Sequence, residues 1–365
     1  MREFQLLIKP VGDRCNLRCK YCFYYGNDAV LAASLDAARR DTERMPDAVL
    51  EQLVSEYLGY RMPQSIFCWQ GGEPTLAGLD FFERVVELQM KHGERGQVVG
   101  NAFQTNGVVI DRRWAQFLAK YRFLVGLSLD GPRAIHEQMR GRSFDAVMRT
   151  AQLFRQLGVE FNILTVVSQS NVRRGGEVYR WLVKHGFHNL QFIPCREVGE
   201  DGQLSPESIT GPELGDFLIE VFETWWSDDV RRVSERNIDS ALAYYVTGTP
   251  TMCSYQGRCS DYLLIERGGE VFPCDFFGQP EWFLGFLGER PLVEYVEQVR
   301  EETFGKLKGQ AAPECRECEW WGLCHGGCPR DRAADGRSHY CEGYKAFFAA
   351  TAARLRQLAA SIRTH

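Results

Sequence analysis

Three cysteines lie close together near the start of the chain, at Cys15, Cys19 and Cys22. Their C-x3-C-x2-C spacing puts three thiolates into one short loop that directly follows a predicted strand. Three thiolates can bind three irons of a cubane [4Fe–4S] cluster, which leaves the fourth iron free to bind a substrate. A zinc knuckle is the alternative, but a zinc site usually has a fourth ligand close by, and the nearest histidine is His92.

A second group of cysteines lies in the last third of the chain. It comprises Cys253, Cys259, Cys274, Cys315, Cys318, Cys324, Cys328 and Cys341. Eight thiolates can complete two [4Fe–4S] clusters, although C-x2-C pairs also suit zinc, so two zinc ribbons are the alternative. The total of 13 cysteines is odd and fits disulfide pairing poorly. The remaining two, Cys68 and Cys195, are interpreted as buried, unreactive thiols.

Two further motifs carry groups that can hold a ligand or accept a proton. The run Gln70-Gly71-Gly72-Glu73-Pro74 follows the second predicted strand, and its carbonyls and carboxylate can accept hydrogen bonds from an ammonium group. Taken alone, such a run is more often an ordinary turn. Asp275 directly follows Cys274 and precedes two phenylalanines, an apolar setting that suits a general base. The alternative role for Asp275 is a hydrogen bond that supports the cysteine loop.

The elements that position these residues can be predicted from periodicity. Strands are predicted at residues 4–8, 66–69, 98–104, 123–128, 161–167 and 190–193. Helices are predicted between them at residues 49–57, 81–90, 114–118, 144–157 and 178–183. Alternation of strands and helices predicts parallel strands joined by crossovers. Because the alternation stops after about six units, we expect an α/β fold with a partial (β/α)6 TIM-like barrel, its functional groups at the carboxyl ends of the strands.

After the predicted barrel, the composition of the sequence changes. Residues 197–212 are polar and glycine-rich and are expected to form a loop, followed by two linking helices. Short strands are predicted at residues 262–266 and 271–272, within a small Cys-rich domain that needs metal to hold its shape. We therefore divide the chain into a barrel at 1–212, linking helices at 213–249, a Cys-rich domain at 250–342 and a C-terminal helix at 343–365.

Composition excludes several classes of protein. The chain has 365 residues, 44% of them hydrophobic and 25% charged, with a formal net charge of −5. A negative balance argues against a nucleic acid or an anionic membrane as the main partner. No stretch approaches the roughly 20 apolar residues of a membrane span, and the first ten residues lack the apolar core of an export signal. We therefore expect a cytoplasmic protein, in a compartment that keeps thiols reduced.

Taken together, these motifs resemble a known family. The cysteine triplet, with Tyr21 beside its last cysteine, resembles the signature of radical S-adenosylmethionine (SAM) enzymes, and the Gly-Gly-Glu run stands where that family has the same motif. Several strand ends resemble the anaerobic sulfatase-maturating enzymes: residues 69–76, 104–107, 126–132, 135–136 with Arg140, 161–164 and 191–195. The cysteines of the last third resemble a SPASM domain, which carries two auxiliary iron–sulfur clusters.

The resemblance implies ligands for each cofactor. The SAM site would be lined by Tyr21, Gly71, Gly72, Glu73, Ser128, Arg140 and the backbone near Arg196. Ser128 and Arg140 have an alternative role in local structure, as a helix cap and a solvated face. The nearer auxiliary cluster would be held by Cys253, Cys259, Cys274 and Cys328. The farther one would be held by Cys315, Cys318, Cys324 and Cys341. The cofactors implied are thus three [4Fe–4S] clusters, with SAM as cosubstrate.

The resemblance also implies a reaction. A 5′-deoxyadenosyl radical would remove a hydrogen atom from Cβ of a cysteine or serine in a sulfatase polypeptide, and Asp275 would take the thiol or hydroxyl proton. The remaining electron would pass to the nearer auxiliary cluster, and the product would be Cα-formylglycine. Tyr24 and Gln70 are expected to face the peptide. The expected electron donor is a small protein such as flavodoxin or ferredoxin.

Two other functions fit parts of this pattern. A SPASM enzyme that makes a thioether, a cyclophane or an epimerised residue in a ribosomal precursor peptide would use the same clusters, although no separate leader-binding segment is expected before Cys15. A zinc-stabilised binding module is the alternative from another class. Iron and labile-sulfide analysis separates it from an iron–sulfur enzyme.

Overall fold

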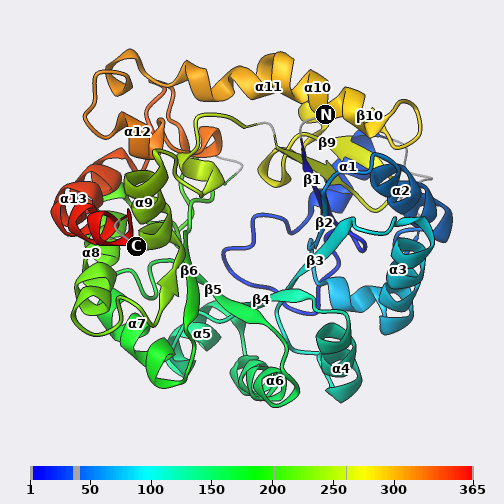
Figure 1. Cartoon of the computed structure of the whole chain (residues 1–365), viewed down its shortest axis with the longest axis horizontal. Helices are drawn as coiled ribbons and strands as arrows, with labels where there is room; N and C mark the ends of the chain where they lie inside the picture. Colours follow the sequence, from blue (N-terminus) through cyan, green and yellow to red (C-terminus); the bar gives the residue numbers. More distant parts are fainter. Residues whose placement is uncertain (1–2, 36–41, 200–201, 260, 364–365) are drawn as a thin grey trace.

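One curved sheet organises the chain. The computed structural model describes residues 3–35, 42–199, 202–259 and 261–363. Its ten strands follow the order β10-β9-β8-β1-β2-β3-β4-β5-β6-β7, and β1 to β6 pair in parallel with their sequence neighbours. These six strands are β1 (Gln5–Ile8), β2 (Gln64–Trp69), β3 (Val98–Thr105), β4 (Leu124–Ser128), β5 (Phe161–Val167) and β6 (Asn189–Pro194). The predicted parallel partial barrel is confirmed (Figure 1).

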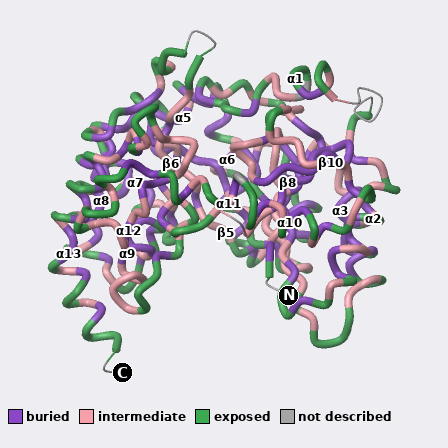
Figure 2. The backbone as a smooth tube through the Cα atoms, turned by 90° about the horizontal axis from the view of Figure 1, so that it is seen from above, coloured by how far each residue is buried: buried purple, intermediate pink, exposed green. Residues whose placement is uncertain are grey.

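Helices cover the outer face of this sheet. The five predicted crossover helices are α2 (Asp47–Gly59), α3 (Leu79–His92), α4 (Arg112–Lys120), α6 (Phe144–Leu157) and α7 (Gly175–Lys184). Figure 1 shows them outside the strands, and Figure 2 shows exposed stretches along the outer helices with buried stretches inside. Each helix buries one apolar stripe, such as Phe81, Phe82 and Val85 of α3, against the sheet. Because the six strands run in parallel, their carboxyl ends lie at the same edge of the sheet.

Five helices of the described residues were not predicted from the sequence: α1 (Asn27–Ser34), α5 (Arg133–Arg140), α10 (Leu292–Glu301) and the one-turn helices α11 (Thr303–Lys306) and α12 (Trp321–Cys324). The first two have only eight residues each, too few to display a helical period clearly. The linking helices α8 (Gly211–Asp228) and α9 (Arg236–Thr247) and the closing helix α13 (Cys341–Arg363) agree with prediction. Helix α8 begins earlier than expected because Thr210 and Glu213 cap it reciprocally.

The Cys-rich part continues the same sheet. Strand β8 (Tyr262–Ile265) pairs in parallel with β1, and β9 (Glu270–Phe272) pairs antiparallel with β8. The short strands β10 (Gly285–Phe286) and β7 (Ser234–Glu235) form the two ends. From α10 to α12 (Trp321–Cys324) the chain runs across the upper side of Figure 1, between the β1 and β6 ends of the parallel strands. Helix α13 packs on α8 and α9 and completes this side.

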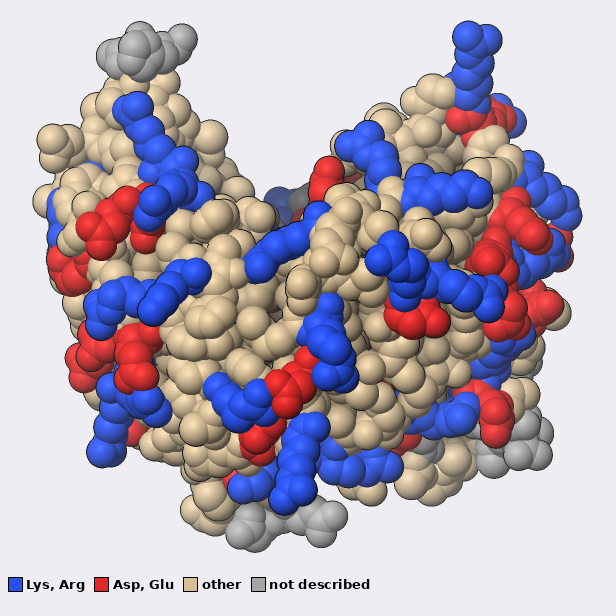
Figure 3. Space-filling model, turned by 90° about the horizontal axis from the view of Figure 1, so that it is seen from below, with Lys and Arg blue, Asp and Glu red and all other residues tan. Residues whose placement is uncertain are grey.

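The surface carries mixed charge. On the face seen in Figure 3, basic and acidic side chains are interspersed, and the outline is notched between two lobes. None of the described helices is long and apolar enough to cross a membrane.

Candidate active site

Unpartnered polar groups gather where strands of the barrel end. Four buried side-chain atoms without a hydrogen-bond partner are Lys9 Nζ, Gln70 Nε2, Arg196 Nε and Asp275 Oδ1. The first three follow the carboxyl ends of β1, β2 and β6, and Asp275 reaches Lys9 from the segment after β9. Lys9 and Asp275 form an ion pair with each other, so Gln70 Nε2 and Arg196 Nε are the two atoms of this group without any partner. Buried polar atoms normally have partners, so these two indicate a place where a ligand binds. The predicted position of the functional groups agrees with this arrangement.

The cysteine triplet lies in a loop pinned from two sides. The Gly72 and Glu73 N–H groups donate to the Gly12 and Arg14 carbonyls at 2.8 Å each. The Leu17 N–H group donates to Cys15 Sγ at 3.4 Å. Burial, together with the charges of Cys22 and Cys15, raises the pKa of Cys19 to about 11 although Arg140 acts to lower it. Three thiols that share one loop and repel one another's charge fit a positively charged iron cluster.

The Gly-Gly-Glu motif supports this loop through its backbone and its carboxylate. The fully buried Glu73 carboxylate accepts hydrogen bonds from the Thr75 hydroxyl at 2.7 Å, the Thr105 hydroxyl at 2.8 Å and the Asn106 N–H group at 2.7 Å. Asn106 Nδ2 in turn donates to Asn16 Oδ1 at 2.7 Å, beside Cys15. The carboxylate is thus engaged by protein groups and joins β2 to β3, which leaves the carbonyls of the motif as acceptors for a ligand.

Asp130 was not predicted, yet it connects two of the expected SAM-site residues. Its buried carboxylate accepts hydrogen bonds from the Tyr21 hydroxyl, from Arg140 Nε at 3.0 Å and from the Val166 N–H group at 3.1 Å. Burial acts to lower the pKa of the Arg140 guanidinium, but the charge of Asp130 has the larger effect and raises this pKa above its usual range. Ser128 is buried at the end of β4, two residues away. In the sequence, Asp130 stood out only as part of the 126–132 run that resembles the family, shortly after a predicted strand.

Asp275 lies beside a buried cation. Lys9 Nζ is 2.7 Å from Asp275 Oδ1 and 3.3 Å from the centre of the Tyr24 ring. The Tyr24 hydroxyl donates to both Glu266 oxygens at 2.7 Å, so Tyr24 faces this cluster of charges with its hydroxyl and ring. The sequence predicted an apolar setting for Asp275 from its two phenylalanines. The structure corrects this, because the neighbour of the Asp275 carboxylate is the Lys9 ammonium and the Asp275 side chain is 18% exposed.

Arg330, Phe276, Phe23 and Arg196 form a surface next to this cluster of charges, which we call the arginine–aromatic wall. The Arg330 guanidinium carbon lies 4.4 Å from the centre of the Phe276 ring, and Arg330 donates to both Glu197 oxygens, at 2.8 and 2.7 Å. Arg196 Nη1 donates to the Arg330 carbonyl at 3.1 Å. Phe23 is 43% exposed and lies 5.0 Å from Phe276, ring centre to ring centre. An exposed ring beside a held arginine is a surface on which a peptide can pack.

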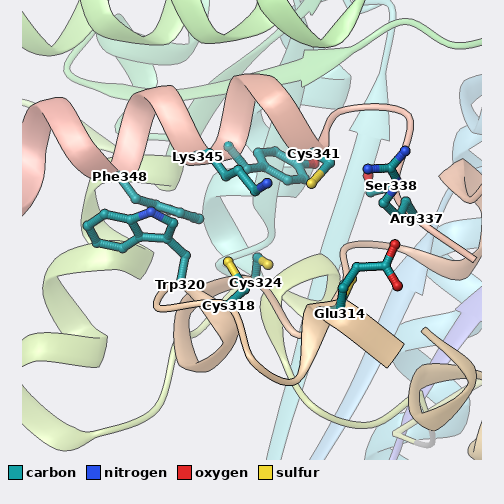
Figure 4. Close-up of a pocket in the computed structure, with 12 residues that line it drawn as sticks. Glu314, Cys318, Trp320, Cys324, Arg337, Ser338, Cys341, Lys345 and Phe348 are labelled. Carbon is teal, nitrogen blue, oxygen red and sulfur yellow. The ribbon is translucent and has the colours of Figure 1, made fainter. Parts of the chain in front are cut away.

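Four cysteines of the last third line a single cavity of about 50 Å³. They are Cys315, Cys318, Cys324 and Cys341, the set that the resemblance assigns to the farther cluster. In Figure 4 the cysteine at the start of α13 faces Cys318 and Cys324 across the cavity. Trp320 and Phe348 flank one side of the cavity, and Glu314 and Arg337 flank the other. Four thiols around one enclosed space fit a closed cluster.

Three of the other four cysteines lie near a second buried lysine, Lys308. Burial lowers the pKa of the Lys308 ammonium, although the charges of Cys259, Cys328 and Cys253 act to raise it. Its ammonium donates to the Ser254 and Gly327 carbonyls at 2.7 and 2.6 Å. Among the described residues, no group of three or more His, Cys, Asp or Glu side chains could hold a metal ion.

Comparison with known proteins identifies the family. Residues 10–182 match the radical SAM superfamily. The chain is 38% identical to the cysteine-type anaerobic sulfatase-maturating enzyme of Clostridium perfringens, over 100% of both chains. It is 32% identical to the serine-type enzyme of Bacteroides thetaiotaomicron, over 95% of this chain and 89% of the relative. This chain belongs to the anaerobic sulfatase-maturating enzymes.

Solved structures agree with this assignment. The structure titled native anSMEcpe with bound AdoMet and Cp18Cys peptide matches with a TM-score of 0.88 and 37% identity, over 99% of this chain and 100% of that one. Streptococcus suis SuiB bound to its precursor peptide SuiA matches with a TM-score of 0.65 over 92% of this chain and 75% of that one, but at 16% identity, which shows the fold alone. As a radical SAM enzyme, the chain is expected to bind a [4Fe–4S] cluster and SAM, and the cysteine loop fits that cluster.

The two cysteines outside the cluster sets differ in exposure. Cys195 is 2% exposed, and burial raises the pKa of its thiol to about 12. Cys68 is part-exposed in β2, yet burial raises the pKa of its thiol to about 11. The predicted burial is confirmed for Cys195, whereas Cys68 is part-exposed. The raised pKa of each thiol favours the protonated, less reactive form.

Substitution of Gly72 by alanine is expected to disrupt the cluster loop of this radical SAM enzyme. A Cβ at Gly72 would lie 2.1 Å from the Arg14 carbonyl oxygen, so the loop must move. We expect Gly72→Ala to lower iron content and SAM cleavage together, by about tenfold or more, since such a clash displaces cluster ligands. The matched control is Gly59→Ala at the end of α2, where a Cβ has no neighbour within 4 Å. Wild-type iron content and turnover in Gly72→Ala would contradict this role of Gly72.

Proposed function

We propose that this enzyme oxidises Cβ of a cysteine or serine side chain in a sulfatase polypeptide to Cα-formylglycine. The observation that carries the proposal is the position of Asp275, whose carboxylate lies beside Lys9 where strands of the barrel end and next to Phe276 of the arginine–aromatic wall. Gln70 follows the neighbouring strand, where its backbone N–H group donates to the Ile8 carbonyl at 2.8 Å. The names of the full-length relatives, cysteine-type and serine-type sulfatase-maturating enzymes, and the peptide bound in anSMEcpe support the same conclusion.

The chain's own residues have separate tasks in this reaction. When bound, the cluster and SAM supply the 5′-deoxyadenosyl radical that removes a hydrogen atom from Cβ. Asp275 accepts the proton of the substrate thiol or hydroxyl. Loss of the hydrogen atom, of this proton and of one electron, which would pass to the nearer auxiliary cluster, leaves a C=S or C=O bond. A thioaldehyde then exchanges sulfur for water oxygen and releases hydrogen sulfide. Gln70 Nε2, buried and unpartnered, is placed to hold the peptide backbone.

Cofactor contacts are proposed on the same basis. Tyr21, Gly71, Gly72, Ser128, Arg140 and the backbone at Arg196 line the SAM site, with Glu73 acting through the backbone of its motif. The triplet holds the SAM-binding cluster. The last-third cysteines hold two auxiliary clusters in the sets described above, which gives three in total. The reducing electron comes from a small flavodoxin or ferredoxin.

The division at residues 212, 249 and 342 into barrel, linking helices, SPASM domain and C-terminal helix is proposed with this function. This division is based on the higher cysteine content after residue 250. Strands β8 and β9 of the SPASM domain nevertheless belong to the same sheet as the barrel. We also propose that the enzyme works in the cytoplasm, because all 13 cysteines are free thiols and the clusters need reducing conditions.

A mass measurement tests the proposal. Anaerobically purified enzyme is incubated with SAM, a reductant and a sulfatase-derived peptide that contains cysteine or serine at the target position. The cysteine peptide is expected to exchange sulfur and two hydrogens for one oxygen, and the serine peptide to lose two hydrogens. An unchanged mass for both peptides, with SAM cleavage intact, contradicts the proposal. It would favour a ribosomal precursor peptide as substrate, for an enzyme of the fold shared with SuiB.

A further inference from the structure

Lys9 is a buried charged residue without an assigned role. It follows β1 directly and is only 1% exposed, although charged side chains are almost never fully buried unless paired. Its ammonium lies 2.7 Å from Asp275 Oδ1 and 3.7 Å from Glu266 Oε1. Neither approach satisfies hydrogen-bond geometry, so the interaction with Asp275 is a close charge contact and not an aligned hydrogen bond. A lysine placed in this way has an electrostatic role at Asp275.

The position of the ammonium is determined by groups other than Asp275. The Tyr24 ring lies beneath Lys9 Nζ, 3.3 Å from ring centre to nitrogen, an arrangement that attracts a cation. Tyr24 is itself held by its hydroxyl bonds to Glu266. The stem of Lys9 packs against Gly71, where an added Cβ would lie 3.0 Å from Lys9 Cβ. The aliphatic part and the ammonium of Lys9 are therefore both held by groups other than Asp275.

Asp275 is the less constrained partner. It lies in a short turn after β9, and its side chain is 18% exposed. Because Oδ1 is buried against Lys9, this exposure belongs to the rest of the side chain. A fixed cation that holds one carboxylate oxygen leaves the other oxygen free of the lysine. Such preorganisation matters, because misplacing a reacting group by about 1 Å can cost about 100-fold in rate.

We propose that Lys9 is a positioning residue for the proton acceptor Asp275. The ammonium holds Oδ1 by charge attraction and so aims the second carboxylate oxygen at the substrate thiol or hydroxyl. Lys9 does not itself touch the substrate. This inference rests on the proposed function, and it adds a residue that acts only on proton removal and not on SAM cleavage.

The test separates these two steps. Lys9→Met removes the charge and keeps much of the apolar stem, and Lys9→Gln removes the charge while keeping a polar end. For each variant, formylglycine is measured by mass spectrometry and 5′-deoxyadenosine by chromatography, with iron content as a check on folding. We expect product to fall about 10- to 100-fold, with deoxyadenosine within about twofold of wild type. Lys91→Met, which removes an exposed lysine paired with Glu51, is the control and keeps wild-type product.

A double-mutant cycle tests whether Lys9 acts through Asp275. In an Asp275→Asn background, Lys9→Met is expected to lower product by less than about twofold further, since residues that act through each other are not additive. Multiplicative losses would overturn the inference, and so would unchanged product or a parallel fall of product and deoxyadenosine. Loss of iron in both Lys9→Met and Lys9→Gln would also overturn it, by showing that Lys9 holds the cluster loop. Failure of the wild-type enzyme to form any aldehyde would instead reject the proposed function.

Discussion

Asp275→Asn is expected to reduce aldehyde formation about 100- to 10,000-fold, the range over which a positioned general base contributes. Asparagine has nearly the same shape but cannot take the proton from the substrate thiol or hydroxyl. SAM cleavage should remain largely intact, because Asp275 lies beside Lys9 and Tyr24 and not in the Cys15 loop. The measurement is product and 5′-deoxyadenosine in the same anaerobic reaction.

The control for this variant is an exposed carboxylate on the outer helix layer. Asp80 of α3 pairs with Arg44 at 2.8 Å and is far more exposed than Asp275, so Asp80→Asn should keep full turnover. Unchanged aldehyde formation in Asp275→Asn would remove Asp275 from its role. Equal loss of SAM cleavage and aldehyde would point to a disturbed fold and not to a lost base.

Replacing all three cysteines of the N-terminal loop is expected to abolish SAM cleavage. The variant Cys15→Ala with Cys19→Ala and Cys22→Ala has no thiolate left for the SAM-binding cluster. The eight cysteines of the last third are unchanged, and four of them line their own cavity. Iron should therefore fall from about 12 to about 8 per chain, the content of two remaining cubanes. Iron analysis and deoxyadenosine formation provide the measurements.

Cys68→Ser is the matched control for the triple variant. It removes a thiol from β2 that lies outside the three cysteine sets, so iron content and SAM cleavage should stay at wild-type levels. Paramagnetic resonance adds an independent check, since addition of SAM to the reduced wild-type enzyme should change the spectrum and addition to the triple variant should not. Deoxyadenosine formed by the triple variant would refute the assignment of the triplet.

The predicted barrel agrees with the structure because its signals are local. Each strand and helix carries its own periodicity, and the order of strands β1 to β6 follows the order along the chain. The short helices α1 and α5 were missed because eight residues display little more than two turns. The addition of β8 to the β1 edge was also not predicted, since pairing between distant strands has no local pattern.

The site residues likewise fall into those that local spacing predicts and those whose surroundings depend on distant parts of the chain. Cys15, Cys19 and Cys22 could be recognised because their spacing is a property of one loop. Asp275 was recognised from its place beside Cys274, but its surroundings were not. The register that pairs Ile8 with Ile265 brings Lys9 and Glu266 together, and Tyr24 bonds to Glu266 across 242 positions. Short-range spacing is written in the order of residues, whereas the charges around a buried carboxylate depend on which distant backbones pair and in which register.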